Sequence, residues 1–87
     1  MLEVDSFSAW LRNEKEYTSD RSISDVFSRL RRAERILPNR KMDNYYITDL
    51  EGCPEFTRLE TTVKSQIRKA IRLRIAYEEY AKENGRL

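Results

Sequence analysis

The sequence contains no histidine, one cysteine, and only two glycines and two prolines among its 87 residues. With Cys53 as the lone thiol and no imidazole, the usual zinc ligand sets and the Ser-His-Asp or Cys-His nucleophile systems cannot form. The glycines stand apart at Gly52 and Gly85, so no glycine-rich loop can hold a phosphate. We therefore expect no metal, no cofactor and no enzymatic activity, and we interpret the chain as a binding module.

Long hydrophobic runs are absent as well. No apolar stretch approaches the roughly 18 residues that a membrane span needs, and the first ten residues lack the basic start and apolar core of a secretory signal. Hydrophobic residues make up 39% of the chain, which is too many for a disordered tail. A single cysteine forms no internal disulfide, as is usual in a reducing compartment. The composition predicts one small cytoplasmic domain without membrane contact.

Charge is segregated along the chain, although the net charge is only +2. Residues 21–41 hold seven basic and two acidic residues, and residues 64–74 hold five basic residues and no acid. Residues 1–20 and 42–63 are acidic, each with five acids, against two and one basic residues respectively. A merely solvated helix face usually mixes both signs, so this segregation indicates a partner of opposite charge.

Apolar residues recur every three or four positions, which is the spacing of one helix face. Ser22 is the expected cap of the second helix, Pro38 its stop, and Gly85 the stop of the last helix. Residues 39–53 carry apolar side chains without a readable period. We expect either one short helical turn or an irregular packed loop there, formed by Tyr45, Tyr46, Ile47 and Leu50. The prediction is an all-α bundle of four helices, or five if the turn after Pro54 is counted separately. The predicted helices span residues 5–16, 22–37, 54–59 and 62–82.

Helical geometry turns the basic residues of two of these helices away from the predicted core. Several arginines and lysines on adjoining helices would neutralise the phosphates of duplex DNA and release its counterions. Arginine can also bind the edge of a guanine through two hydrogen bonds. The outward residues are Ser28, Arg31, Arg32 and Arg35 in the second helix and Lys64, Arg68, Lys69 and Arg72 in the last.

Another group of residues favours a different function. Arg74 lies within the apolar stripe of the last helix, so it either pairs with an acid such as Asp49 or Glu51 or belongs to an interface. Ile75 and Tyr80 widen the apolar arc of that helix beyond what one neighbour needs. The alternative is a small helical interaction or regulatory module that docks on an acidic protein or self-associates through Arg74, Ile75 and Tyr80.

Three short motifs resemble the N-terminal core-binding domain of phage integrases and other tyrosine recombinases. They are FSAWL at residues 7–11, SISDVFSRLRR at 22–32, and VKSQIRKAI at 63–71, which is followed by an aromatic end at Tyr77 and Tyr80. The resemblance covers roughly residues 5–82. It implies a SAM-like four-helix bundle that clamps duplex DNA, with two helices facing the major groove. Residues 39–53 match the family poorly.

The resemblance also implies which residues contact DNA and that DNA binding and strand cleavage belong to separate domains. In the family, strand cleavage belongs to a separate domain with an Arg-His-Arg set and a tyrosine nucleophile, whereas this chain has no histidine. We therefore expect a non-catalytic module for double-stranded DNA, either excised or stand-alone. Its further partners would be a catalytic recombinase domain or a second copy. The implied DNA contacts are Ser28, Arg31, Arg32, Arg35, Lys64, Ser65, Arg68, Lys69 and Arg72.

Overall fold

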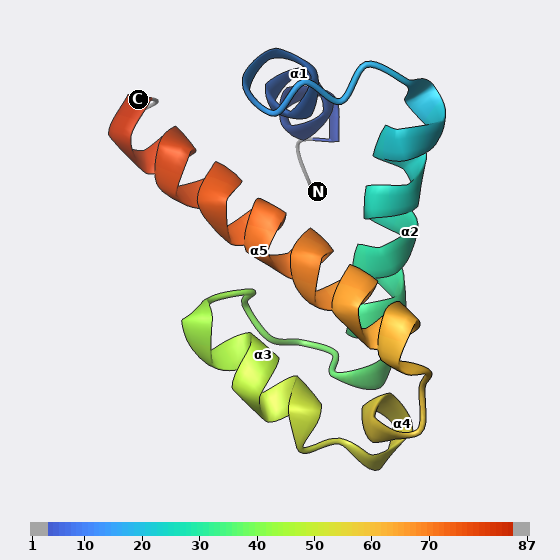
Figure 1. The fold of residues 1–87 in the computed structure, drawn as a ribbon. Coiled ribbons are helices and arrows are strands. Elements are labelled where there is room, and N and C mark those ends of the chain that lie inside the picture. Colours follow the sequence, from blue (N-terminus) through green and yellow to red (C-terminus); the bar gives the residue numbers. More distant parts are fainter. Residues whose placement is uncertain (1–3, 85–87) are drawn as a thin grey trace.

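The computed structural model describes residues 4–84, with side chains for residues 6–83. This range contains five helices joined by short loops. They are α1 (Val4–Glu14), α2 (Asp20–Ile36), α3 (Asn44–Glu51), α4 (Pro54–Thr57) and α5 (Thr61–Asn84). No strand occurs in this range, so the predicted all-α class is confirmed. None of these helices is long and apolar enough to span a membrane. The long α5 crosses the molecule diagonally and contacts α1, α2 and α3 (Figure 1).

Helix boundaries differ from the predicted ones by up to two residues. α2 begins at Asp20 because Ser19 caps it, its side-chain oxygen accepting a hydrogen bond of 3.0 Å from the backbone N–H of Ser22. The expected cap, Ser22, therefore lies inside the helix. α4 ends at Thr57, two residues earlier than predicted. Gly85, the predicted stop of the last helix, lies outside the described residues.

α1 ends in a turn that the sequence does not reveal. The backbone N–H of Tyr17 donates a hydrogen bond of 3.0 Å to the carbonyl oxygen of Leu11, which also accepts from the backbone N–H of Lys15. Between these two donors, Glu16 lies in the left-handed region with φ 59°. Glycine is the usual residue at this position because a side chain costs energy there.

α3 occupies the segment whose periodicity was unreadable. A carboxylate oxygen of Asp43 caps the helix, accepting hydrogen bonds of 3.0 Å and 3.2 Å from the backbone N–H groups of Tyr45 and Tyr46. Tyr46 and Leu50 are the only buried residues of this eight-residue helix. Two core positions are too few to establish a helical period, and the cap is therefore the better signal.

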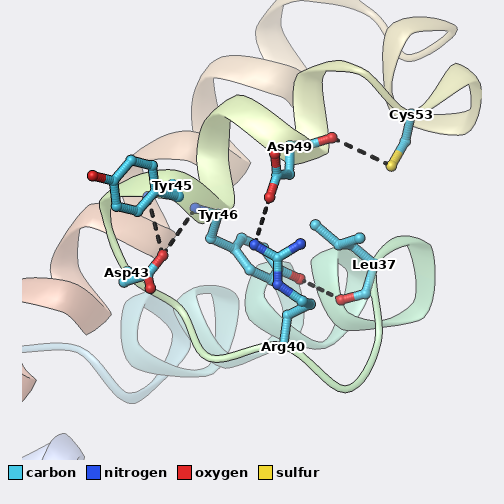
Figure 2. Close-up of polar contacts among 7 residues, drawn as sticks. All are labelled: Leu37, Arg40, Asp43, Tyr45, Tyr46, Asp49 and Cys53. Atoms are coloured by element: carbon cyan, nitrogen blue, oxygen red, sulfur yellow. Dashed lines mark hydrogen bonds and ion pairs between the residues drawn. The ribbon is translucent and has the colours of Figure 1, made fainter.

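Tyr46 joins α3 to the end of α2. Its ring is fully buried, and its hydroxyl group lies 2.9 Å from the carbonyl oxygen of Leu37 (Figure 2). The same hydroxyl lies 3.1 Å from the carbonyl oxygen of Ala33. The carbonyl oxygen of Ala33 also accepts from the backbone N–H of Leu37, whereas a carbonyl at the helix end, such as that of Leu37, has no partner within the helix and gains one from this hydroxyl. Burial raises the pKa of the Tyr46 hydroxyl to about 12.

Aromatic rings fill the core between α1 and the C-terminal half of α5. The ring centroid of Phe7 lies 6.1 Å from that of Trp10, 5.3 Å from Phe27 and 5.1 Å from Tyr77. Such ring pairs each contribute about 0.5–1.5 kcal/mol beyond the burial of their area. The remaining core side chains are mainly aliphatic. The full set of buried residues is Phe7, Trp10, Leu11, Ile23, Val26, Leu30, Ala33, Met42, Tyr46, Leu50, Phe56, Ile67, Ala70, Ile71 and Tyr77.

Candidate nucleic-acid interface

The outward face of α2 carries a dense group of basic side chains. One stripe of this helix is buried and the opposite side is polar, as expected for a helix with 100° between successive residues. Four of its five arginines are exposed and Arg29 is partly buried. The buried stripe consists of Ile23, Val26, Leu30 and Ala33. The exposed arginines are Arg21, Arg31, Arg32 and Arg35, and Ser28 is exposed among them.

None of the α2 arginines forms an ion pair with the side chains of residues 6–83. Four arginines outside α2 do have acidic partners. These pairs are Arg12 with Asp20, Arg40 with Asp49, Arg68 with Glu51, and Arg74 with Glu78. Outside α2, four of the six described arginines are thus paired within the fold, whereas all five arginines of α2 lack an ion pair there.

Three of the five acids in the segment 42–63, namely Asp43, Asp49 and Glu51, have partners within the fold. Asp49 Oδ2 lies 2.5 Å from an Nη atom of Arg40 (Figure 2), and this hydrogen bond raises the pKa of the Arg40 guanidinium above its ordinary value. The carbonyl oxygen of Asp49 also accepts a contact of 3.5 Å from the thiol of Cys53. Asp43 caps α3. These acids serve local partners and do not offset the charge on α2.

The basic residues of α5 lie in different environments. Arg68 turns toward α3 and α4: its Nε donates to Glu51 Oε2 at 2.6 Å, and its guanidinium lies 5.6 Å from the ring centroid of Phe56. Arg72 lines a groove of about 440 Å³ between α3 and α5. Lys69 is exposed. On a helical wheel of α5 it lies between Arg72 and the side of the helix that packs against α2. The two remaining predicted residues are Lys64, which is partly buried, and Ser65, which is exposed.

A second groove, of about 210 Å³, lies between α2 and α5 and includes part of the basic face of α2. We refer to it as the α2/α5 groove. The predicted residues Ser28 and Arg32 line it, but the predicted residues of α5 do not. Its α5 wall instead includes Gln66, which was missed because basic charge and the family resemblance guided the selection on that helix. The complete lining is Asp25, Ser28, Arg29, Arg32, Val63, Gln66 and Ile67.

Arg74 occupies the interior of the molecule. Its side chain is only 12% exposed, and one Nη atom lies 3.0 Å from Glu78 Oε2. Its guanidinium lies 5.2 Å and 5.3 Å from the ring centroids of Phe7 and Tyr77, which is the geometry of cation–π contacts. The other Nη atom is buried and has no hydrogen-bond partner in the described residues.

The acids expected to pair with Arg74 have other partners. The prediction that Arg74 pairs with an acid is confirmed by Glu78, but the two acids named for it, Asp49 and Glu51, bind Arg40 and Arg68 instead. The reason is that Arg74 lies on the side of α5 that faces the aromatic core, away from the α3 groove. Of the other two residues of the predicted protein interface, Ile75 is partly buried and lines the α3/α5 groove, and Tyr80 is 40% exposed.

No protein-family model matches the sequence, and neither the curated proteins nor the solved structures contain a match to it. The resemblance to the core-binding domain of tyrosine recombinases therefore depends on the three short motifs alone. The structural features that bear on function are the arginines of α2, which lack ion pairs to the described side chains, and the α2/α5 groove.

Proposed function

We propose that the chain is a non-catalytic module that binds double-stranded DNA through α2, with support from the exposed residues of α5. The observation that carries this proposal is the set of five α2 arginines without an ion pair to any described side chain. Uncompensated arginines on one helix face match a polyanion with regularly spaced charges. Duplex DNA is such a polyanion, and binding it releases condensed counterions.

The dimensions of α2 suit the major groove. A helix with its side chains is about 10–12 Å across, and the major groove of B-DNA is about 12 Å wide. Arg31 and Arg35 are four residues apart and thus lie one turn from each other on the same side of the helix. Their guanidinium groups can bind phosphate oxygens through paired hydrogen bonds. Phosphate contacts would then set the position of the module on the duplex.

α5 contributes less than the resemblance implies. Ser65 and Lys69 are exposed, and Lys69 lies nearer to the α2 side of the helical wheel than Ser65 does. Arg68 would first have to leave Glu51, because its Nε already donates to that carboxylate at 2.6 Å. Arg72 lies in the groove toward α3. In our proposal, α2 is the principal DNA-binding element, and the resemblance to the recombinase domain provides secondary support.

Fluorescence anisotropy with a labelled random duplex of 25 base pairs tests the proposal at 50 and 200 mM salt. We expect binding that weakens steeply with salt, because each phosphate contact contributes a slope of about 0.9 in the plot of log affinity against log salt. Absence of binding at 50 mM salt would refute the proposal. A duplex of unrelated sequence should bind similarly, because phosphate contacts dominate.

A matched pair of double variants tests the role of α2. Arg31→Ala with Arg35→Ala should lower the salt slope by about 1.8, which corresponds to two phosphate contacts. The control, Lys41→Ala with Arg58→Ala, removes the same charge from exposed residues outside α2 and α5 and should leave the slope nearly unchanged. Equal losses in the two variants would show that net charge, rather than α2, governs binding.

The second candidate is the protein-interaction module. It draws support from a groove of about 380 Å³ between α1 and α5, which Trp10, Tyr77 and Tyr80 line in part. Tyr80 is 40% exposed at this groove. Sedimentation velocity distinguishes the two functions, since a stable dimer without DNA affinity would favour self-association. A monomer with salt-dependent DNA affinity would favour the DNA-binding module.

A further inference from the structure

The α2/α5 groove has a chemistry that phosphate binding alone does not require. It contains a carboxylate, Asp25, and an amide, Gln66, beside Arg29 and Arg32. A carboxylate repels phosphate, so a surface that only holds the DNA backbone gains nothing from Asp25. The other exposed arginines of α2, such as Arg35, lie outside this groove. The outward face of α2 therefore has two chemically distinct parts.

The polar groups of the groove match the edges of bases. In the major groove, a glutamine amide pairs with N6 and N7 of adenine, a carboxylate accepts from N4 of cytosine, and an arginine donates to O6 and N7 of guanine. The α2/α5 groove offers all three kinds of side chain: Gln66, Asp25 and Arg29 with Arg32. A mixture of donors and acceptors is suited to a patterned partner, whereas a uniform anion needs donors alone.

The two helices hold these side chains on a rigid support. Ile67, next to Gln66, is fully buried, and Val63, one turn earlier, is partly buried. Asp25 is partly buried and forms no ion pair with the described side chains, so its acceptor capacity is unused there. Side chains on packed helices are held more precisely than side chains on loops, as the reading of base edges requires.

We propose that the α2/α5 groove reads base edges, so that the module prefers particular DNA sequences, with Gln66 and Asp25 as specificity-determining residues. This inference rests on the proposed DNA-binding function. It assigns the groove to sequence readout and the arginines outside it to phosphate contact. The two roles predict different responses to substitution, because phosphate contacts weaken all sequences alike, whereas base contacts discriminate among them.

Selection of bound duplexes from a pool with a randomised central segment tests the assignment. The wild-type chain should enrich a sequence motif. Gln66→Ala should lose the preference at one base pair of that motif by about tenfold, within the range of a bidentate base contact. Asp25→Asn should lose the preference at another base pair and should bind random duplex more tightly, because a phosphate-repelling charge is removed.

Asn13→Ala serves as the matched control, since it removes an exposed amide from α1 and should retain the wild-type motif. Circular dichroism establishes that each variant is folded before it enters the selection. If the wild-type chain binds DNA with a steep salt dependence but enriches no motif, the groove assignment is overturned and the proposed function stands. Retention of the wild-type motif by both Gln66→Ala and Asp25→Asn would also overturn it. If the wild-type chain binds no DNA, the proposed function itself fails.

Discussion

Tyr46→Phe removes a single oxygen atom from the interior and leaves the buried ring in place. The hydroxyl lies 2.9 Å from the carbonyl oxygen of Leu37, which caps the C-terminal end of α2, and 3.1 Å from that of Ala33. Loss of this donor leaves a carbonyl group at the helix end without a protein partner, which costs about 1–3 kcal/mol. For a domain of this size, each kcal/mol lowers Tm by about 4–8 °C.

The same hydroxyl makes the stability depend on pH in the alkaline range. Burial raises the pKa of Tyr46 to about 12, above the value near 10 of an exposed tyrosine. A raised pKa in the folded state means that the unfolded chain loses its proton first as the pH increases. The stabilisation is therefore complete below pH 10 and is lost between pH 10 and 12. At pH 11 the loss is about 1.4 kcal/mol.

Urea unfolding followed by circular dichroism at pH 8 and pH 11 measures both effects. Tyr45→Phe is the control, because this neighbouring tyrosine is 74% exposed. Tyr46→Phe should be less stable than wild type at pH 8, and the gap should narrow by about 1.4 kcal/mol at pH 11, while Tyr45→Phe should follow the wild type at both. Equal stability of wild type and Tyr46→Phe at pH 8, or a gap that stays constant with pH, would refute the reasoning.

Three further predictions concern α1 and the charge network. Glu16→Gly should increase the free energy of unfolding by about 0.5–1 kcal/mol in urea, because φ is 59° at this residue and glycine adopts that conformation without strain; a loss of stability would contradict this. Phe7→Ala should destabilise the fold by about 3–5 kcal/mol in the same assay, and a loss below 1 kcal/mol would show that the aromatic core is loosely packed. Glu51→Gln should release Arg68 and raise the salt slope of DNA binding by about 0.9, whereas an unchanged slope would exclude Arg68 from the interface.

Local patterns were sufficient to predict most of the helices. The spacing of Ile23, Val26 and Leu30 defines the buried stripe of α2, and Pro54 starts α4 where expected. These signals are short in range, because a helix repeats every 3.6 residues and its caps lie within one turn. For α3 the sequence left a helical turn and an irregular loop both open, because this helix contributes only two buried side chains. Glu16 is not a residue type that indicates the left-handed conformation it adopts.

The sequence by itself determined the all-α class, the segregated charge and the outward position of Arg31, Arg32 and Arg35. Only the tertiary structure decided which charges remain uncompensated. The contact between Arg68 and Glu51 joins residues 17 positions apart, and no periodicity predicts such a pair. The same holds for the α2/α5 groove, where Gln66 meets residues of α2. The physical reason is that helix periodicity specifies the face of each residue, whereas helix crossing specifies what that face meets.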